Sequence, residues 1–302
     1  MRDLLQDLRY AVRMLRKRPG ASAVIVLTLA FGIGINATFF SNYYAMALRP
    51  LPFDDPDELI QLHRSEPEAG RKLMGVAEGT LLDWRQRQEG LSGLGAFTYQ
   101  SFNLHAAELP ERVEGAEISV DLFPLLGVEP TQGRPFTADE DRPGGAKVAL
   151  VGHALWQRSL GGDPEVVGRA LEINGEAYEI IGVMPEGFAF PLWQEVWIPL
   201  GLDPETAPRG SGPLQVIGRL REGVDLPTVR QVFESLSRRE TEEHPEVPEG
   251  MSVHLVPLHD AWMPPVTRVA GLIMQGLVTL VLFIVCTNVA NMILAQATVR
   301  RR

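Results

Sequence analysis

The sequence contains very little cysteine: Cys286 is the single one among 302 residues. An intrachain disulfide is therefore excluded, and any folded domain outside the cytoplasm has to be stabilised by its hydrophobic core alone. The segment 49–268 has 220 residues. It is long enough to do this, since a chain of that size buries most of its surface on folding.

Charge is absent from two long stretches. No Asp, Glu, Lys, Arg or His occurs in residues 21–48 or 269–299, which contain 28 and 31 residues. About 20 predominantly apolar residues cross a bilayer, so both stretches are predicted to be transmembrane helices. The composition thus excludes a simple cytosolic enzyme, a collagen-like chain and a disordered tail.

A cleaved signal peptide is the alternative for the first stretch. The apolar region of such a peptide is only about 7–15 residues long, and a small-residue cleavage site follows it. Here the apolar run is longer, and the small-residue site at 45–47 comes unusually late. The sequence therefore favours a retained span.

The net charge of −10 is distributed unevenly along the chain. Residues 1–20 carry six basic and two acidic side chains, a net charge of +4, and residues 300–302 are three arginines, so the rest of the chain carries −17. Basic residues next to membrane ends are retained in the cytoplasm. Both termini are therefore predicted to be cytoplasmic and residues 49–268 extracytoplasmic. An acidic outer domain also argues against nucleic acid as a partner.

Residues 1–20 are predicted to form a cytoplasmic amphipathic helix. Between Asp3 and Arg18, apolar side chains recur at helical spacing and arginines occupy the other face. A basic amphipathic helix beside a span is expected either in the inner headgroup layer or against a cytoplasmic partner protein. The sequence leaves both interpretations open.

Both predicted spans contain small and polar residues. In the first, Ala30 and Gly34 form one small-x-x-x-small pair and Ala37 and Ser41 another, which allows a second helix to approach closely. The spans also contain four asparagines: Asn36, Asn42, Asn288 and Asn291. Such polar groups are expected to prefer a helix–helix interface to lipid. They suggest that further helices are missing from this chain or are supplied by a partner.

The segment between the spans is predicted to be an α+β domain with two lobes, about 49–201 and 214–260, joined by a Pro- and Gly-rich linker. The clearest local signal is Asn174-Gly175, which suits the φ > 0 positions of a type I′ hairpin turn. The smaller lobe is predicted to be a β-α-β unit. Predicted strands are 59–63, 94–104, 113–120, 147–151, 170–173, 177–183, 196–199, 214–219 and 252–256. Predicted helices are 80–87, 122–126, 154–160 and 228–239.

No catalytic, cofactor-binding or metal site is predicted. The sequence has neither the Gly-x-Ser-x-Gly element of a hydrolase nor the Gly-x-x-x-x-Gly-Lys-Ser/Thr loop of an ATPase. The acids at 139–141 are interpreted as a solvated loop or helix start, and the glycine pairs 144–145 and 161–162 as turns. His254 and His259 would fall on opposite faces of an extended strand. The six histidines show no metal-ligand spacing: His63, His105, His153, His244, His254 and His259.

Several segments together resemble the MacB-like, FtsX-type ABC transporter permeases. They are 27–36 (LTLAFGIGIN), 39–41 (FFS), 48–52 (LRPLP), 123–128 (FPLLGV), 133–136 (GRPF), 154–156 (ALW), 161–164 (GGDP), 182–188 (GVMPEGF) and 286–292 (CTNVANM). The resemblance covers essentially the whole chain. It is greatest to the duplicated orphan permease group of this family.

This resemblance implies a periplasmic core domain at 49–268 between transmembrane helices at 21–48 and 269–299, the second of which begins an FtsX-type permease region. It implies a subunit in the bacterial inner membrane, itself not an enzyme, in which a separate ABC ATPase drives motion of the outer domain for export or efflux. Family members continue with further spans, so 300–302 is interpreted as a truncated end, with a homodimer or a partner supplying the remaining spans. The alternative is a membrane-anchored periplasmic binding or scaffold module without transport activity.

Overall fold

The computed structural model describes residues 19–44, 51–105 and 110–299. The chain divides into two compact units: unit 1 contains Met1–Pro50 and Met263–Arg302, and unit 2 contains Leu51–Trp262. The amphipathic helix predicted over 1–20 lies outside the described residues except for its last two positions. The terminal arginines at 300–302 also lie outside them.

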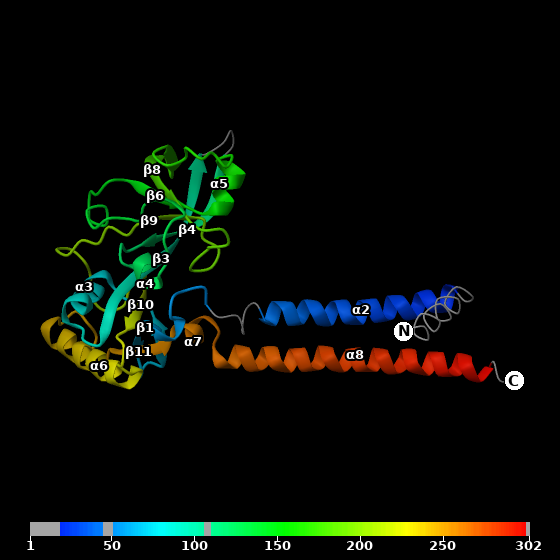
Figure 1. The fold of residues 1–302 in the computed structure, drawn as a ribbon. Coiled ribbons are helices and arrows are strands. Elements are labelled where there is room, and N and C mark those ends of the chain that lie inside the picture. Colours follow the sequence, from blue (N-terminus) through cyan, green and yellow to red (C-terminus); the bar gives the residue numbers. More distant parts are fainter. Residues whose placement is uncertain (1–18, 45–50, 106–109, 300–302) are drawn as a thin grey trace. The chain divides into compact units, whose positions relative to one another are not determined.

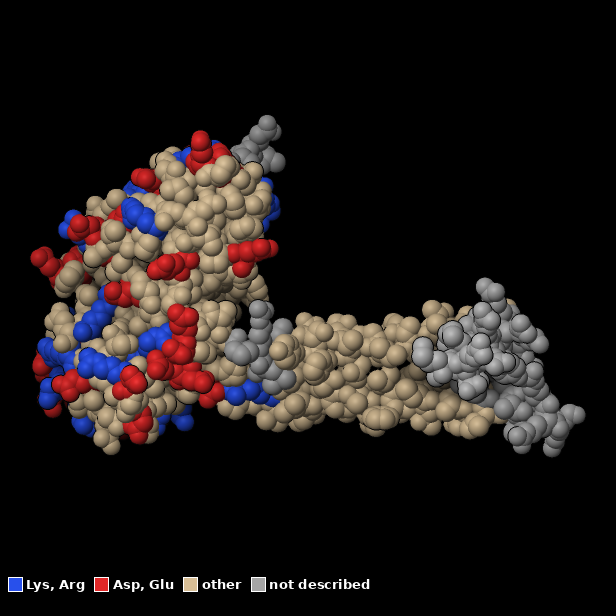
Figure 2. Space-filling model, in the orientation of Figure 1, with Lys and Arg blue, Asp and Glu red and all other residues tan. Residues whose placement is uncertain are grey.

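Unit 1 is a pair of long helices packed against each other, α2 (Pro19–Tyr43) and α8 (Pro265–Val299) (Figure 1). Within them, Ser22–Tyr43 and Pro265–Met292 are long and apolar enough to cross a membrane. Their outward side chains are apolar: Phe31 is 73% exposed and Phe283 67% exposed. Figure 2 shows few charged side chains on this pair and many over unit 2. Such a surface is suited to lipid.

Unit 2 is built on one mixed sheet, which has 11 strands in the described residues. Its main path is β11-β1-β10-β3-β4-β9-β6-β8-β5, while β2 pairs with β1, and β7 pairs with β3 and β8. The strands are β1 (Leu59–Glu66), β2 (Arg71–Met74), β3 (Leu91–His105), β4 (Glu111–Ile118), β5 (Gln132–Gly133), β6 (Val148–Val151), β7 (Ala170–Ile173), β8 (Glu176–Val183), β9 (Val196–Pro199), β10 (Gln215–Leu220) and β11 (Ser252–Pro257). The helices are η2 (Pro56–Glu58), α3 (Glu78–Arg87), α4 (Leu122–Leu126), α5 (His153–Ser159), α6 (Leu226–Glu243) and α7 (Leu258–Trp262).

One end of the sheet contains a split β-α-β unit. Strands β10 and β11 lie on either side of β1, both antiparallel to it, and α6 connects them. Asp225 caps α6 by accepting the backbone N–H of Thr228. Phe233, on the buried face of α6, packs edge-on against Trp84 of α3 with ring centroids 5.1 Å apart. The β-α-β unit predicted over 214–260 is present, and β1 lies between its two strands.

The other end of the sheet contains the β7–β8 hairpin and the parallel pair β6–β8. At the hairpin turn, Asn174 has φ 53° and Gly175 has φ 82°. Both values are positive, as a type I′ turn requires, so the predicted turn is confirmed. The side chain of Asn174 also accepts the backbone N–H of Asn103 at 2.9 Å, which holds the turn against β3.

Strand β3 connects the two ends of the sheet. Residues 91–97 pair with β10, and residues 97–104 pair with β4, so this 15-residue strand takes part in both. The predicted α+β class and the two long apolar helices are confirmed, whereas the division into two lobes stays a prediction. The sequence does not predict β2, β5 or α7, because each is short and lacks a periodic apolar pattern.

Candidate functional site

The six histidines lie on separate elements. Among the described residues, no group of three or more His, Cys, Asp or Glu side chains is arranged to hold a metal ion. His63 on β1 lies directly opposite His254 on β11. Burial, together with the charge of His254, lowers the pKa of His63 to about 4, so it is neutral at pH 7. His259 does not continue the strand of His254, since β11 ends at Pro257 and a helix that contains His259 follows.

Two of the three consecutive acids have their carboxylates engaged in polar contacts within unit 2. Glu140 pairs with the guanidinium of Arg134 at 2.6 Å. Asp141 accepts the backbone N–H groups of Val120 and Gly201, each at 2.8 Å. Burial raises the pKa of Asp141, and the two backbone hydrogen bonds oppose this shift. The carboxylate of Glu140 thus binds within its own loop, whereas that of Asp141 joins this loop to the segments at Val120 and Gly201.

The third acid, Asp139, and the glycine pairs 144–145 and 161–162 lie in surface turns. Asp139 is exposed and pairs with Arg142 at 3.3 Å. In the same turn, the N–H of Gly145 donates to the carbonyl of Arg142 at 2.9 Å. The glycine pair 161–162 follows α5, with φ values of 69° and 64°. These values lie in the left-handed region that glycine occupies at little cost.

A buried ion pair lies where β1 meets α6. Arg64 is 0% exposed and Glu240 5% exposed, and Nη1 of Arg64 lies 2.9 Å from Oε2 of Glu240. Arg64 also donates to the hydroxyl of Ser237 at 2.8 Å, and Glu240 accepts the hydroxyl of Thr80. Burial lowers the pKa of Arg64, and Glu240 opposes that shift. Sequence reasoning missed this pair, because β1 (LIQLHRSE) mixes apolar and polar residues and nothing in it marks Arg64 as buried.

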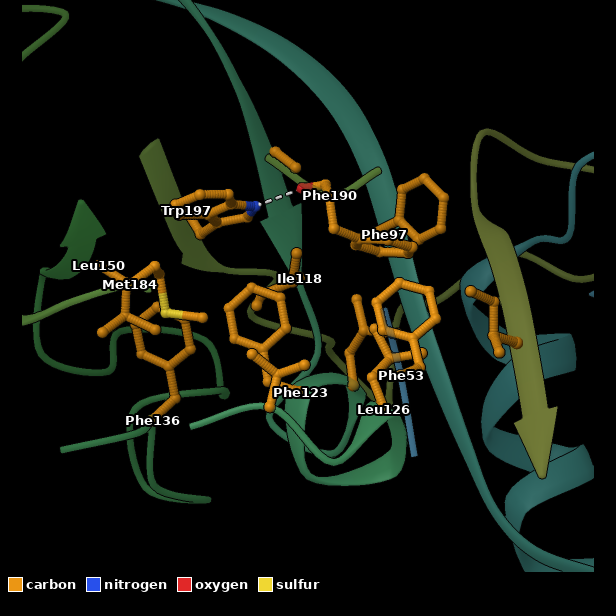
Figure 3. Packing of buried hydrophobic residues seen from close by; sticks show 14 of the residues in the cluster. Phe53, Phe97, Ile118, Phe123, Leu126, Phe136, Leu150, Met184, Phe190 and Trp197 are labelled. Carbon is orange, nitrogen blue, oxygen red and sulfur yellow. Dashed lines mark hydrogen bonds between the residues drawn. The ribbon is translucent and has the colours of Figure 1, made fainter. Parts of the chain in front are cut away.

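Aromatic side chains gather where the chain enters and leaves unit 2. Phe53 lies near the first residue of the unit and Trp262 is its last, and both contact the ring of Phe190, with centroids 5.5 and 5.3 Å away. Phe190 also packs against Phe97 of β3, at 5.3 Å. Its carbonyl accepts the indole N–H of Trp197 at 2.8 Å (Figure 3). The entry and the exit of unit 2 are therefore fixed to the same part of its core.

The two helices of unit 1 are joined by neutral polar contacts. Nδ2 of Asn36 donates to Oγ1 of Thr279 at 3.2 Å, and Nε2 of Gln275 donates to Oδ1 of Asn36 at 3.3 Å. Asn36 thus lies at a helix–helix interface, as predicted. The other three asparagines, also expected at such an interface, are exposed on the surfaces of the two helices: Asn42, Asn288 and Asn291.

An apolar groove of about 530 Å³ lies between α2 and α8. Phe31 and Gly32 line it from α2, and Val281 lines it from α8. A Cβ at Gly32 would lie 3.2 Å from the side chain of Leu282, so the absence of a side chain allows the helices to approach closely. The groove has the character of a surface that contacts lipid or another helix.

A family model described as the MacB-like periplasmic core domain matches residues 22–236, more than two thirds of the chain. The chain belongs to this family. The match begins within α2, includes most of unit 2 and ends within α6. It confirms the resemblance to MacB-like ABC transporter permeases. The family is one of ABC transporter permease domains.

Two solved structures are similar to this chain. One is the periplasmic region of MacB from Actinobacillus actinomycetemcomitans, with a TM-score of 0.50, 13% identity, and coverage of 68% of this chain and 90% of that one. The other is a domain of a protein described as a permease from Porphyromonas gingivalis, with a TM-score of 0.54, 16% identity, and coverage of 68% and 93%. At these identities the likeness shows the fold alone. No curated protein sequence matches the chain.

Proposed function

We propose that the chain is the membrane subunit, or the N-terminal part of one, of a MacB-like ABC transporter. In this proposal, ATP hydrolysis on a separate cytoplasmic ATPase is coupled to motion of unit 2, and this motion drives export or efflux. The observation that carries the proposal is the family match over 22–236, together with two apolar helices that bracket unit 2 in the sequence. A homodimer, or a partner that supplies further spans, would complete the membrane part.

The proposed topology places both termini in the cytoplasm and residues 49–268 in the periplasm. It rests on the basic residues at the outer ends of two charge-free stretches. The test uses a Cys286→Ala chain with one new cysteine, either Leu73→Cys in unit 2 or Arg2→Cys at the N-terminus, and a membrane-impermeant maleimide. In spheroplasts the cysteine at 73 is expected to react, and the one at 2 only after permeabilisation. The opposite pattern would overturn the topology.

The proposed ATPase contact is the basic segment 1–20. An ATPase that binds one of two arrangements of the membrane subunit more tightly shifts the population between them. The full chain, reconstituted with its ATPase in proteoliposomes, is expected to change the ATPase rate. Charge reversal at Arg13, Arg16 and Lys17 is expected to abolish that change, whereas reversal of the exposed Arg71 in unit 2 leaves it intact. A chain with no effect on the ATPase would instead favour the anchored binding or scaffold module.

A further inference from the structure

The segment after Phe190 presents an apolar tip on the surface of unit 2. Leu192 is 51% exposed and Trp193 74% exposed, the largest value among the large hydrophobic side chains described in this unit. They are also neighbours in the sequence, unlike the other exposed large hydrophobic residues described there. No charged residue lies between Glu186 and Glu195. The tip is therefore a local apolar surface without charge.

Buried polar contacts hold the backbone on both sides of this tip. The side chain of Gln194, which is 4% exposed, accepts the backbone N–H groups of Leu192 at 2.7 Å and Trp193 at 3.1 Å. On the other side, the indole N–H of Trp197 donates to the carbonyl of Phe190 (Figure 3). The backbone is thus fixed while two apolar side chains project outward. A tip fixed in this way loses little conformational entropy on binding.

The aromatic contact that precedes this tip lies a short stretch of chain from the second charge-free run. The ring of Phe190 stacks on Trp262, with centroids 5.3 Å apart and planes at 24°. Trp262 precedes Pro265, the first residue of α8, by three positions, and the charge-free run begins at Val269. Backbone dimensions and the helix rise therefore keep the Cα atom of Trp262 within about 17 Å of that of Val269. Trp193 in turn follows Phe190 by three residues.

We infer that Leu192 and Trp193 insert into the headgroup layer of the outer leaflet, so that unit 2 contacts lipid directly at this tip. Tryptophan is enriched at membrane–water interfaces because its ring is apolar and its N–H is polar. The absence of charge from the segment avoids the cost of removing a charged group from water. The inference rests on the membrane-spanning part of the proposed function and not on coupling to ATP.

The test uses the full chain with Cys286→Ala, reconstituted in vesicles of phosphatidylcholine and phosphatidylglycerol. An environment-sensitive fluorophore is attached to a single cysteine introduced by Trp193→Cys, Leu73→Cys or Phe283→Cys, and nitroxide-labelled lipid is the quencher. Leu73 is the matched control, because it is also an exposed apolar side chain of unit 2, at 68% exposure. It lies on a different segment, β2, which pairs with the last residues of β1. Phe283 reports whether α8 lies in the bilayer.

Lipid quenching at position 193 is expected to exceed that at position 73 by about twofold or more, since interfacial tryptophan lies at headgroup depth. Quenching at 283 without quenching at 193 would overturn the inference and leave the spans intact. No quenching at 283 would overturn the membrane-spanning premise and the inference with it. A label at 193 shielded from aqueous iodide but unquenched by lipid would assign the tip to a protein contact, and this would also overturn it.

A second measurement keeps the native side chain. Brominated lipid quenches nearby tryptophan, so the intact chain is expected to lose a larger fraction of its emission than the Trp193→Phe variant does. Because Trp193 is exposed, this variant should retain the far-UV circular dichroism spectrum and the unfolding midpoint of the parent. Equal fractional quenching of the two chains would contradict lipid contact at Trp193.

Discussion

The two units place polar side chains in contact in different ways. In unit 2, Arg64 and Glu240 form an ion pair at 2.9 Å within an apolar core. In unit 1, Asn36 and Gln275 are neutral amides that form hydrogen bonds of 3.2–3.3 Å between two helices whose outer surfaces are apolar. A buried charge without its partner is far more costly than an unpaired amide. Unit 2 is therefore expected to depend on specific pairings, and unit 1 on apolar length and close packing.

The largest predicted effect concerns Glu240. Replacement by Leu leaves the guanidinium of Arg64 buried without its counter-ion, and breaking a buried pair in this way costs about 3–5 kcal/mol of unfolding free energy. The measurement is urea unfolding of the full chain in detergent micelles, followed by tryptophan fluorescence. Glu243→Leu is the matched control on the same helix, because its ion pair with Arg87 is exposed and exposed pairs contribute about 0–1 kcal/mol.

The double variant Arg64→Met, Glu240→Leu separates charge from shape. With both charges removed, most of the lost stability is expected to return, since apolar replacements of buried pairs are often neutral or stabilising. A double variant as unstable as Glu240→Leu alone would show that the fit of these side chains, rather than their charge, stabilises the site. That result would mean that unit 2, like unit 1, is stabilised mainly by close packing.

How far the sequence predicts these features depends on whether each has a local cause. Absence of charge predicts the two long helices, apolar runs predict most strands, and Asn174-Gly175 predicts a hairpin. The contact between Arg64 and Glu240 has no such signal, since it joins residues 176 positions apart. Strand β2, whose first three residues are exposed, lacks the alternation that identifies a half-buried strand. Likewise, composition does not reveal that Trp193 is exposed while Trp197 is buried.

The next prediction concerns His63, which is buried without an anionic partner described beside it. Its pKa of about 4 lies below the ordinary value of 6.5, so the unfolded chain binds this proton first as the pH falls. Stability is therefore expected to be lost between pH 6.5 and 4, by about 2 kcal/mol between pH 7.5 and 5. Urea unfolding at these two pH values should show this loss in the parent chain and a smaller loss in His63→Gln.

His105→Gln is the control for this pH dependence, since His105 is exposed at the end of β3. It should leave the larger part of the loss between pH 7.5 and 5 in place, because its contact with Glu172 is exposed and exposed pairs contribute about 0–1 kcal/mol. If His63→Gln retains the full loss as well, other groups account for it, among them His254, whose pKa is lowered by burial and by the nearby charges of Arg230 and Lys72.

The smallest predicted effect concerns Asn36, and it tests the other side of the comparison. Asn36→Leu removes the hydrogen bonds to Thr279 and Gln275, and such bonds between membrane helices contribute about 0.6–2 kcal/mol. The measurement is unfolding of the reconstituted chain in mixed micelles by added dodecyl sulfate, with Asn288→Leu as the control because Asn288 is exposed on α8. A loss for Asn36→Leu as large as that for Glu240→Leu would contradict the stated difference between the two units. The helix pair would then depend on one specific polar contact, as unit 2 does. A loss equal to that of the control would instead leave the apolar packing around Gly32 as the main source of its stability.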